Sequence, residues 1–149
     1  MQTAPHNPRA RNKLGFALAE EGQNEVAINH YRQALAIDPE YRDAHYNLGN
    51  AEKELGRLES AISSYRRAIR LAPDMLIAYN NLGKTLDENG EMAQAAEIFE
   101  HALGVDPNAA EVCNNLGVAH YRLNQFDEAR AAFEKAIELD PNHVGAYTN

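Results

Sequence analysis

The sequence predicts an all-α fold, a solenoid of four successive helical hairpins, and three observations carry this prediction. A short motif, Asn-Asn-Leu-Gly in its fullest form, recurs every 34 residues along the 149-residue chain. Apolar residues in the second half of each repeat follow the i, i+4, i+7, i+8 spacing of a helix with one buried face. Each repeat also closes on a proline, which ends a helix near the preceding residue. Nothing in the sequence resembles a strand, so we expect helices throughout.

Six positions are shared by four consecutive repeats, which span 8–41, 42–75, 76–109 and 110–143. With each repeat numbered from 1, position 7 is Leu, position 8 is Gly, positions 20 and 27 are Ala, position 24 is Tyr or Phe, and position 32 is Pro. Residues 1–7 form an N-terminal tail. Residues 144–149 match the start of a fifth repeat and stop before its Leu-Gly, which suggests a truncated array.

The first helix of each repeat is expected over positions 1 to 14, where positions 3, 7, 10 and 14 form a less uniform apolar stripe. These helices are predicted at 8–21, 42–55, 76–89 and 110–123. Turn-prone stretches follow them, such as Glu-Gly-Gln-Asn at 21–24 and Glu-Asn-Gly-Glu at 88–91.

The second helix of each repeat carries the stripe at positions 20, 24, 27 and 28 and should end shortly before the proline. These helices are predicted at 25–37, 59–71, 93–105 and 127–139. Packed helices approach to about 8–10 Å only where the side chains at their crossing allow it. We therefore expect Gly at position 8 and Ala at positions 20 and 27 to mark the crossing, with Leu at 7 and the aromatic at 24 filling the space around it.

This pattern, kept over residues 8–143, resembles the tetratricopeptide repeat. The sequence departs from that family at position 4, where tryptophan is favoured, and at position 11, where Glu52 and His120 replace large apolar residues. The departures suggest locally looser packing. The resemblance implies a right-handed superhelix whose first helices line a concave groove, and it implies protein recognition without catalysis.

In the family's geometry, positions 2, 5, 6, 9, 12 and 13 point into the groove, and here their acidic and basic residues nearly cancel. Asparagine is frequent among them, and position 6 reads Asn47, Asn81, Asn115 and Asn149 after Lys13 in the first repeat. A carboxamide offers a carbonyl acceptor and N–H donors, so a row of them can hold an extended peptide backbone. The row is similar to the asparagine ladder of the O-linked N-acetylglucosamine transferases.

The predicted peptide-binding residues all come from first helices: Asn12, Tyr46, Asn47, Asn50, Asn80, Asn81, Lys84, Asn114, Asn115 and Tyr121. For position 6 an alternative stays open, in which these asparagines only tie neighbouring helices together. At position 5, represented by Asn80 and Asn114, ligand contact is favoured.

Charge and cysteine usage exclude several classes of function. The net charge is −8, from 22 acidic and 14 basic residues, which argues against a nucleic-acid partner. A single cysteine cannot form an internal disulfide, so a reducing cytoplasm is the expected location. The longest apolar run near the N-terminus is too short for a signal sequence or a membrane span, so we expect no direct membrane insertion.

Motifs for catalysis and for metal or cofactor binding are incomplete. Gly83-Lys84-Thr85 imitates the end of a phosphate-binding loop, but Ala78 stands where that pattern needs glycine. The histidines include no i, i+4 pair. Cys113 and His120 are seven residues apart on one predicted helix, which places them roughly 10 Å apart and beyond hydrogen-bond reach. We therefore predict no enzyme, metal or cofactor.

The sequence favours a non-catalytic module that binds an extended peptide or a partner protein in an asparagine-lined groove. One alternative is the substrate-recognition arm of a larger glycosyltransferase. Another is a self-assembling scaffold, because a solenoid without a polar cap should expose an apolar flank on its last hairpin, expected near Ala132, Ala136 and Leu139.

Overall fold

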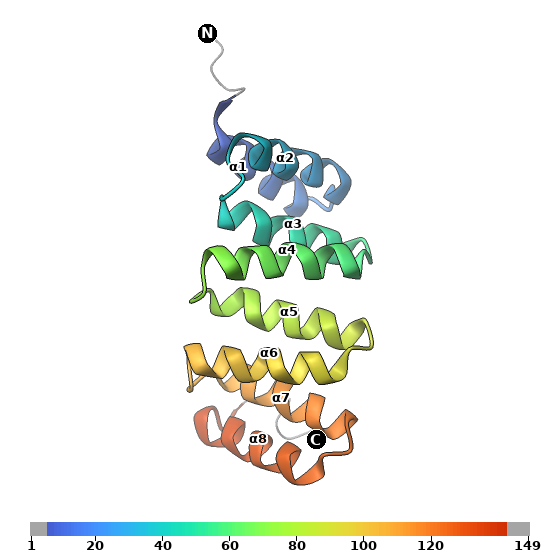
Figure 1. Cartoon of the computed structure of the whole chain (residues 1–149), viewed down its shortest axis with the longest axis vertical. Coiled ribbons are helices and arrows are strands. Elements are labelled where there is room, and N and C mark those ends of the chain that lie inside the picture. The colour runs from blue at the N-terminus through green and yellow to red at the C-terminus, as the bar shows by residue number, and fades with distance from the viewer. Residues whose placement is uncertain (1–5, 143–149) are drawn as a thin grey trace. The chain divides into compact units, whose positions relative to one another are not determined.

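The computed structural model describes residues 6–142, and this part of the chain contains eight α-helices and no strand (Figure 1). The helices are α1 (Pro8–Glu20), α2 (Asn24–Ile37), α3 (Arg42–Glu54), α4 (Leu58–Leu71), α5 (Leu76–Glu88), α6 (Met92–Val105), α7 (Ala110–Arg122) and α8 (Phe126–Leu139). This confirms the predicted all-α hairpin architecture. The match of 144–149 to a fifth repeat lies outside the described residues.

Every helix boundary lies within one residue of its prediction, and the differences follow one rule. Each first helix ends one residue early and each second helix begins one residue early. The turn between them places position 15 in the left-handed region, with φ of 81° at Gly22 and 84° at Gly90. Asn124 takes the same conformation in the fourth repeat, with φ of 62°. Glycine and asparagine suit this conformation, which ends a helix abruptly.

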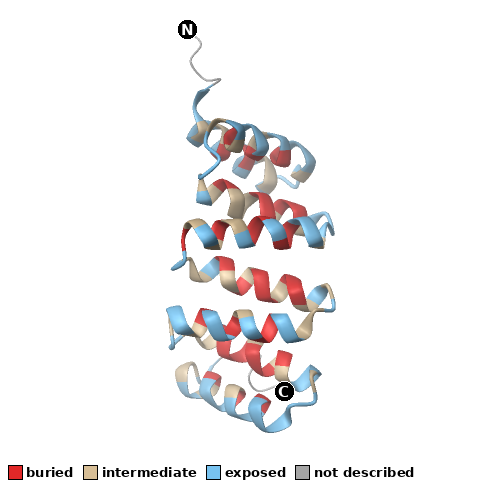
Figure 2. Ribbon diagram, in the orientation of Figure 1, coloured by how far each residue is buried: buried red, intermediate tan, exposed pale blue. Residues whose placement is uncertain are grey.

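Contacts between Cα atoms divide the chain into two units, and the boundary falls inside α5, between Ala78 and Tyr79. In the first unit α1 packs on α2, α3 packs on α4, and α2 also packs on α3. A core cluster joins Ala27, Ile28 and Tyr31 of α2 to Leu48 and Ala51 of α3. Figure 2 shows where the buried residues lie along these helices.

In the second unit α7 packs on α8 and α6 packs on α7. Cys113 and Ala136 form a buried cluster there, with Leu103, Ile137 and Leu139 packed against it. Ala136 is fully buried, so the prediction that it lies on an exposed flank was wrong. The reason is that Ala136 packs against Cys113 of its own hairpin's first helix.

The predicted helix crossing is confirmed in all four hairpins. A methyl group added at Gly15 would lie 2.7 Å from a ring carbon of Tyr31, and one at Gly117 would lie 2.6 Å from a ring carbon of Phe133. Gly49 and Gly83 meet the rings of Tyr65 and Phe99 in the same way. The glycine at position 8 therefore makes room for the aromatic side chain at position 24.

In the second repeat, the leucine at position 7 packs against the preceding hairpin. Leu48, on α3, lies in the cluster formed with α2 of the preceding hairpin. Leu82 is only 1% exposed, whereas Leu14 of the first repeat is 46% exposed. The expectation that this leucine fills space at its own hairpin's crossing was therefore wrong for Leu14, because no preceding hairpin covers it among the described residues.

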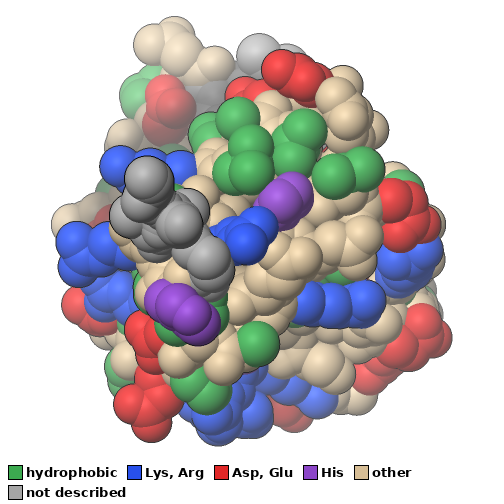
Figure 3. Space-filling model, turned by 90° about the horizontal axis from the view of Figure 1, so that it is seen from above, with side chains coloured by type: hydrophobic (Ala, Val, Ile, Leu, Met, Phe, Trp, Pro, Cys, Tyr) green, Lys and Arg blue, Asp and Glu red, His purple; other side chains and the backbone are tan. Residues whose placement is uncertain are grey.

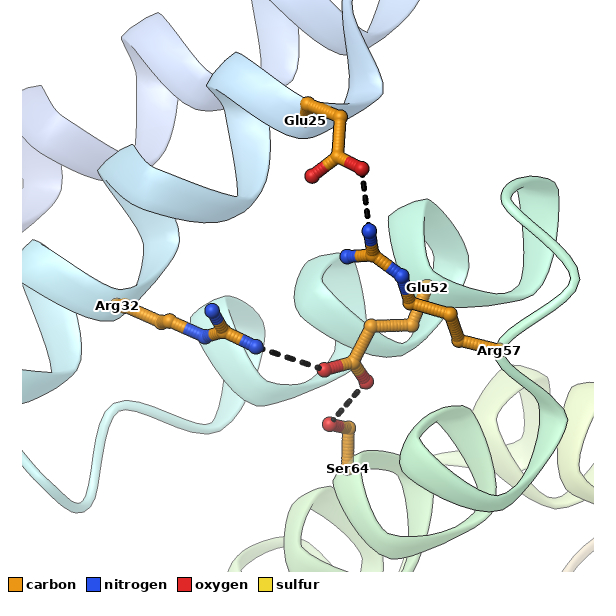
Figure 4. Close-up of polar contacts among 5 residues, drawn as sticks. All are labelled: Glu25, Arg32, Glu52, Arg57 and Ser64. Atoms are coloured by element: carbon orange, nitrogen blue, oxygen red, sulfur yellow. Dashed lines mark hydrogen bonds and ion pairs between the residues drawn. The ribbon is translucent and has the colours of Figure 1, made fainter.

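Position 11 of the second repeat holds a buried charge instead of a loosely packed side chain. Glu52 is 3% exposed. The Ser64 hydroxyl donates a hydrogen bond of 2.7 Å to its Oε2, and Arg32 Nη2 lies 3.8 Å from its Oε1 (Figure 4). Burial raises the pKa of Glu52, although the Ser64 hydrogen bond and the charges of Arg32 and Arg57 oppose that rise.

We expect Glu52→Gln to stabilise the protein increasingly as the pH rises from about 4 to 7, because the reference pKa of glutamate is about 4.3. A carboxyl whose folded pKa is raised contributes stability below its unfolded pKa and loses that contribution as the pH passes through its folded pKa. Glutamine keeps an acceptor for Ser64 and carries no charge to desolvate. Urea unfolding at several pH values measures the difference, and Glu40→Gln, at an exposed site, is the control. Parallel pH curves for the wild type and Glu52→Gln would contradict this interpretation.

Candidate protein-binding surfaces

The first unit has a hollow of about 460 Å³ built chiefly from first helices. Its lining comes from α1, α3 and the turn before α5: Asn12, Lys13, Phe16, Asp43, Tyr46, Asn47 and Met75. Three of the predicted peptide-binding residues, Asn12, Tyr46 and Asn47, therefore lie together. The half-exposed Phe16 ring adds an apolar surface to this set.

Asparagines of neighbouring repeats are hydrogen-bonded to each other in this hollow. Asn47 Nδ2 donates to Asn12 Oδ1 at 3.0 Å, and Asn12 Nδ2 donates to the Tyr41 hydroxyl at 3.3 Å. Asn12 is buried, whereas Asn47 is partly exposed. Position 5 thus supplies an oriented acceptor, and position 6 of the next repeat is the carboxamide nearer to solvent.

The second unit repeats this arrangement with different residues. Asn115 Nδ2 donates to Asn80 Oδ1 at 2.8 Å, and Asn80 Nδ2 donates to Glu111 Oε1 at 3.1 Å. Both asparagine pairs are separated by 35 residues, one repeat plus one position. A carboxamide can make about four hydrogen bonds, so Asn47 and Asn115 each keep a carbonyl oxygen and one N–H beyond this bond.

A hollow of about 300 Å³ lies beside the second pair. It is lined by Lys84, Asp87, Glu88, Phe99, Asn115, Val118 and Arg122. Arg122 Nη1 lies 2.6 Å from Asp87 Oδ2, and Lys84 Nζ lies 3.8 Å from Glu111 Oε1. The other Asp87 oxygen, Oδ1, is buried and has no hydrogen-bond partner among the described residues.

Charges within each hollow are balanced. The first contains Lys13 and Asp43, and the second sets Lys84 and Arg122 against Asp87 and Glu88. Such surfaces do not select a strongly charged ligand by net attraction, and they suit an uncharged group such as a peptide main chain.

The remaining predicted residues have other surroundings. Asn50 Oδ1 accepts a 2.6 Å hydrogen bond from the Tyr65 hydroxyl and so ties α3 to α4. The main-chain oxygen of Asn81 accepts from Thr85, and Asn114 is buried. Tyr121 lines a separate hollow against α8. Asn149 lies outside the described residues.

Phe16, Asp87 and Arg122 face these hollows, although they were not chosen from the sequence. Each stands at a groove position, 9, 12 or 13. Arg122 and Asp87 are also 35 residues apart. This ion pair could have been predicted from the sequence, because opposite charges stand at positions 12 and 13 of successive repeats.

The apparent catalytic motifs have structural roles. Gly83, Lys84 and Thr85 lie within α5, and the buried Thr85 hydroxyl donates to the carbonyl of Asn81 at 2.7 Å. Cys113 is buried, and that burial raises its thiol pKa. In the described part of the chain, no group of three or more His, Cys, Asp or Glu side chains could hold a metal ion. No helix there is long and apolar enough to cross a membrane.

Family models match the repeats along most of the chain. Models described as tetratricopeptide repeat match residues 76–109 and 110–143, and a model described as TPR repeat matches 17–54 and 49–90. The chain belongs to the tetratricopeptide repeat family. The matched ranges follow the 34-residue repeats closely in the second half of the chain. No curated protein matches the chain.

Solved structures of MamA are similar to this tetratricopeptide repeat protein. One crystal structure of MamA is 29% identical, with a TM-score of 0.89, and the match covers 93% of this chain and 81% of that one. A second is also 29% identical, with a TM-score of 0.86 and coverage of 92% and 75%. MamA from Desulfovibrio magneticus RS-1, at 20% identity with a TM-score of 0.86 and coverage of 94% and 79%, shows the shared fold alone. These findings support a protein-interaction or scaffold module.

Proposed function

We propose that the protein is a non-catalytic module whose first helices bind extended segments of partner proteins. The observation that carries this proposal is the pair of asparagine hydrogen bonds, Asn47 to Asn12 and Asn115 to Asn80. Each bond fixes the direction of a carboxamide that keeps one acceptor and one donor for a ligand. A peptide unit presents the complementary N–H and C=O. The alternative of a glycosyltransferase arm stays a prediction that no observation tests.

In this proposal the asparagines have both roles suggested by the sequence, because they join neighbouring helices and they contact the ligand. Asn12 and Asn80, at position 5, are buried and act as fixed acceptors, so we assign ligand contact to Asn47 and Asn115 at position 6. Preorganisation of this kind lowers the entropy lost on binding, because the carboxamide is already oriented before the ligand arrives.

Neighbouring side chains would select among peptides. In the first unit Phe16, Tyr46 and Met75 offer apolar and aromatic surface beside Asn47. In the second unit Asp87 Oδ1, which has no hydrogen-bond partner among the described residues, offers a buried acceptor beside Asn115. We expect the first hollow to take an apolar side chain and the second to take a hydrogen-bond donor, such as a main-chain N–H or a serine hydroxyl.

The test is selection of binding peptides from a random-sequence display library on the full chain, followed by calorimetry. The double variant Asn47→Ala, Asn115→Ala should lose at least about tenfold in affinity, or about 1.4 kcal/mol. Gln33→Ala removes an exposed carboxamide from α2 and should leave affinity unchanged.

Circular dichroism establishes whether the double variant keeps its helices, since each lost hydrogen bond costs about 0.5–1.5 kcal/mol of stability. Equal affinity of a folded double variant and the wild type would show that the asparagines only join helices.

A further inference from the structure

The exposed face of α1 has the same residues as a buried face of α3. Positions 3, 7 and 10 are Ala10, Leu14 and Ala17 in α1 and Ala, Leu and Ala again, at 44, 48 and 51, in α3. All three are exposed in α1, and all three are buried in α3. Figure 3, which looks onto the α1 and α2 end of the chain, shows exposed hydrophobic side chains gathered there. The first helix therefore carries a packing stripe without a cover among the described residues.

What covers this stripe in α3 is the second helix of the preceding hairpin. Leu48 and Ala51 lie in one cluster with Ala27, Ile28 and Tyr31 of α2, and Leu35 packs against it. These α2 residues occupy positions 20, 21, 24 and 28. A surface that fits the exposed stripe of α1 is thus the second helix of a repeat, with a small residue at position 20, an aromatic residue at position 24 and aliphatic residues at positions 21 and 28.

The last hairpin presents such a surface. A hollow of about 330 Å³ lies on α7 and α8, and its apolar lining is Tyr121, Phe126, Ala129, Phe133 and Ile137. Ala129, Phe133 and Ile137 stand at positions 20, 24 and 28. Arg130 replaces the isoleucine or alanine of the other repeats at position 21, so a contact here should be weaker than the internal ones.

An unpaired polar atom marks the same end of the protein. Asn114 is 9% exposed, and its Oδ1 is buried without a hydrogen-bond partner among the described residues. The equivalent oxygens of Asn12 and Asn80 accept a hydrogen bond from position 6 of the following repeat. In α1, position 6 is the exposed Lys13, whose ammonium group can donate a hydrogen bond to this Asn114 oxygen.

A second polar pair fits the same register. In the second unit, Arg122 at position 13 bonds Asp87 at position 12 of the repeat before it. If α1 of one copy follows α7 of another in the same way, Glu20 at position 13 of α1 lies opposite Tyr121 at position 12 of α7. The carboxylate of Glu20 can accept the Tyr121 hydroxyl hydrogen, so the polar groups complement each other.

We propose that α1 of one copy packs on α7 and α8 of a second copy in the register of an internal repeat. Leu14 then enters the hollow formed by Ala129, Phe133 and Ile137, and Lys13 bonds Asn114 Oδ1. Because the two surfaces differ, each added copy leaves one of each exposed, and association continues head to tail. This association does not depend on peptide binding by the asparagines.

Sedimentation of the full chain tests the proposal, over a concentration series that extends to about 1 mM to detect weak association. The average mass of the wild type should rise continuously with concentration. Leu14→Glu blocks α1, and Tyr121→Glu blocks the other end by facing Glu20 with a like charge. Each variant alone should associate at least tenfold more weakly. Both positions are exposed, so both variants should fold, which circular dichroism verifies.

A mixture of the two variants makes the test specific, because each keeps the surface that the other lacks. The mixture should form a one-to-one dimer and nothing larger. A wild type that stays monomeric throughout would overturn the proposal. The proposal would also be overturned if Leu14→Glu associated as strongly as the wild type, because the contact would then not involve α1.

Discussion

Replacing Leu82 by alanine is expected to lower the free energy of unfolding by about 2–5 kcal/mol. The side chain is 1% exposed, so the substitution removes buried methyl and methylene groups and leaves a cavity. Total stabilities of domains are about 5–15 kcal/mol, so this one change should remove a large part of the total. Urea unfolding followed by circular dichroism measures it.

The matched control is Leu14→Ala, the same substitution at the same repeat position. Leu14 is 46% exposed in the described structure, and surface substitutions usually change stability by less than about 0.5 kcal/mol. Equal losses for the two variants would mean that the different burial of Leu82 and Leu14 does not set the cost of the substitution. At concentrations where copies associate, Leu14→Ala should also weaken the head-to-tail contact, so stability is compared in dilute solution.

Gly83→Ala is expected to destabilise the protein by about 1–3 kcal/mol, the usual cost of overpacking a core. An added methyl group would overlap the ring of Phe99. Phe99 is itself buried, so the ring has little room to move. This loss should exceed the helix propensity that alanine gains over glycine, about 0.5–1 kcal/mol.

Gly104→Ala should have the opposite sign. Gly104 lies near the end of α6, and a methyl group there would meet nothing within 4 Å. Only the propensity gain then applies, which raises stability by up to about 1 kcal/mol. Thermal unfolding of both variants gives the two signs directly. A stabilising Gly83→Ala would contradict the tight helix crossing.

Helix positions could be predicted closely because proline and apolar periodicity act locally. Pro39 and its equivalents end each second helix, and the stripe at positions 20, 24 and 27 fixes which side is buried. The one-residue shift at each hairpin turn arose because the left-handed residue at position 15 was not recognised. Asn124 at this position in the fourth repeat shows that the turn needs a residue that tolerates positive φ, which can be asparagine as well as glycine.

Burial was predicted less well where it depends on a neighbouring repeat. Leu14 and Leu48 are the same residue in the same local pattern, yet one is exposed and the other buried, because among the described residues only Leu48 has a hairpin packed against it. Ala136 was placed on the open flank, although it faces its own hairpin. The sequence pattern gives the periodicity of a stripe but not which helix covers it.

The candidate site was predicted as a set of residue types, and its hydrogen bonds were not. Asn12 and Asn47 are 35 residues apart in the sequence. That spacing predicts a hydrogen bond between them only once α1 and α3 are known to lie side by side. Glu52 shows the same limit, because nothing local indicates that Ser64 and Arg32 would accompany it. Pairing between successive repeats is what the structure adds.

In the proposed function, carboxamides on the first helices hold the main chain of a bound polypeptide. The most direct test of this function uses a peptide selected for binding to the full chain and a series of analogues, each N-methylated at one amide. N-methylation removes a main-chain donor and keeps every side chain. We expect that at least one analogue binds tenfold or more weakly to the wild type, and that the same analogue loses little further affinity for Asn47→Ala, Asn115→Ala. If every analogue keeps its full affinity for the wild type, the protein does not recognise the main chain of the peptide.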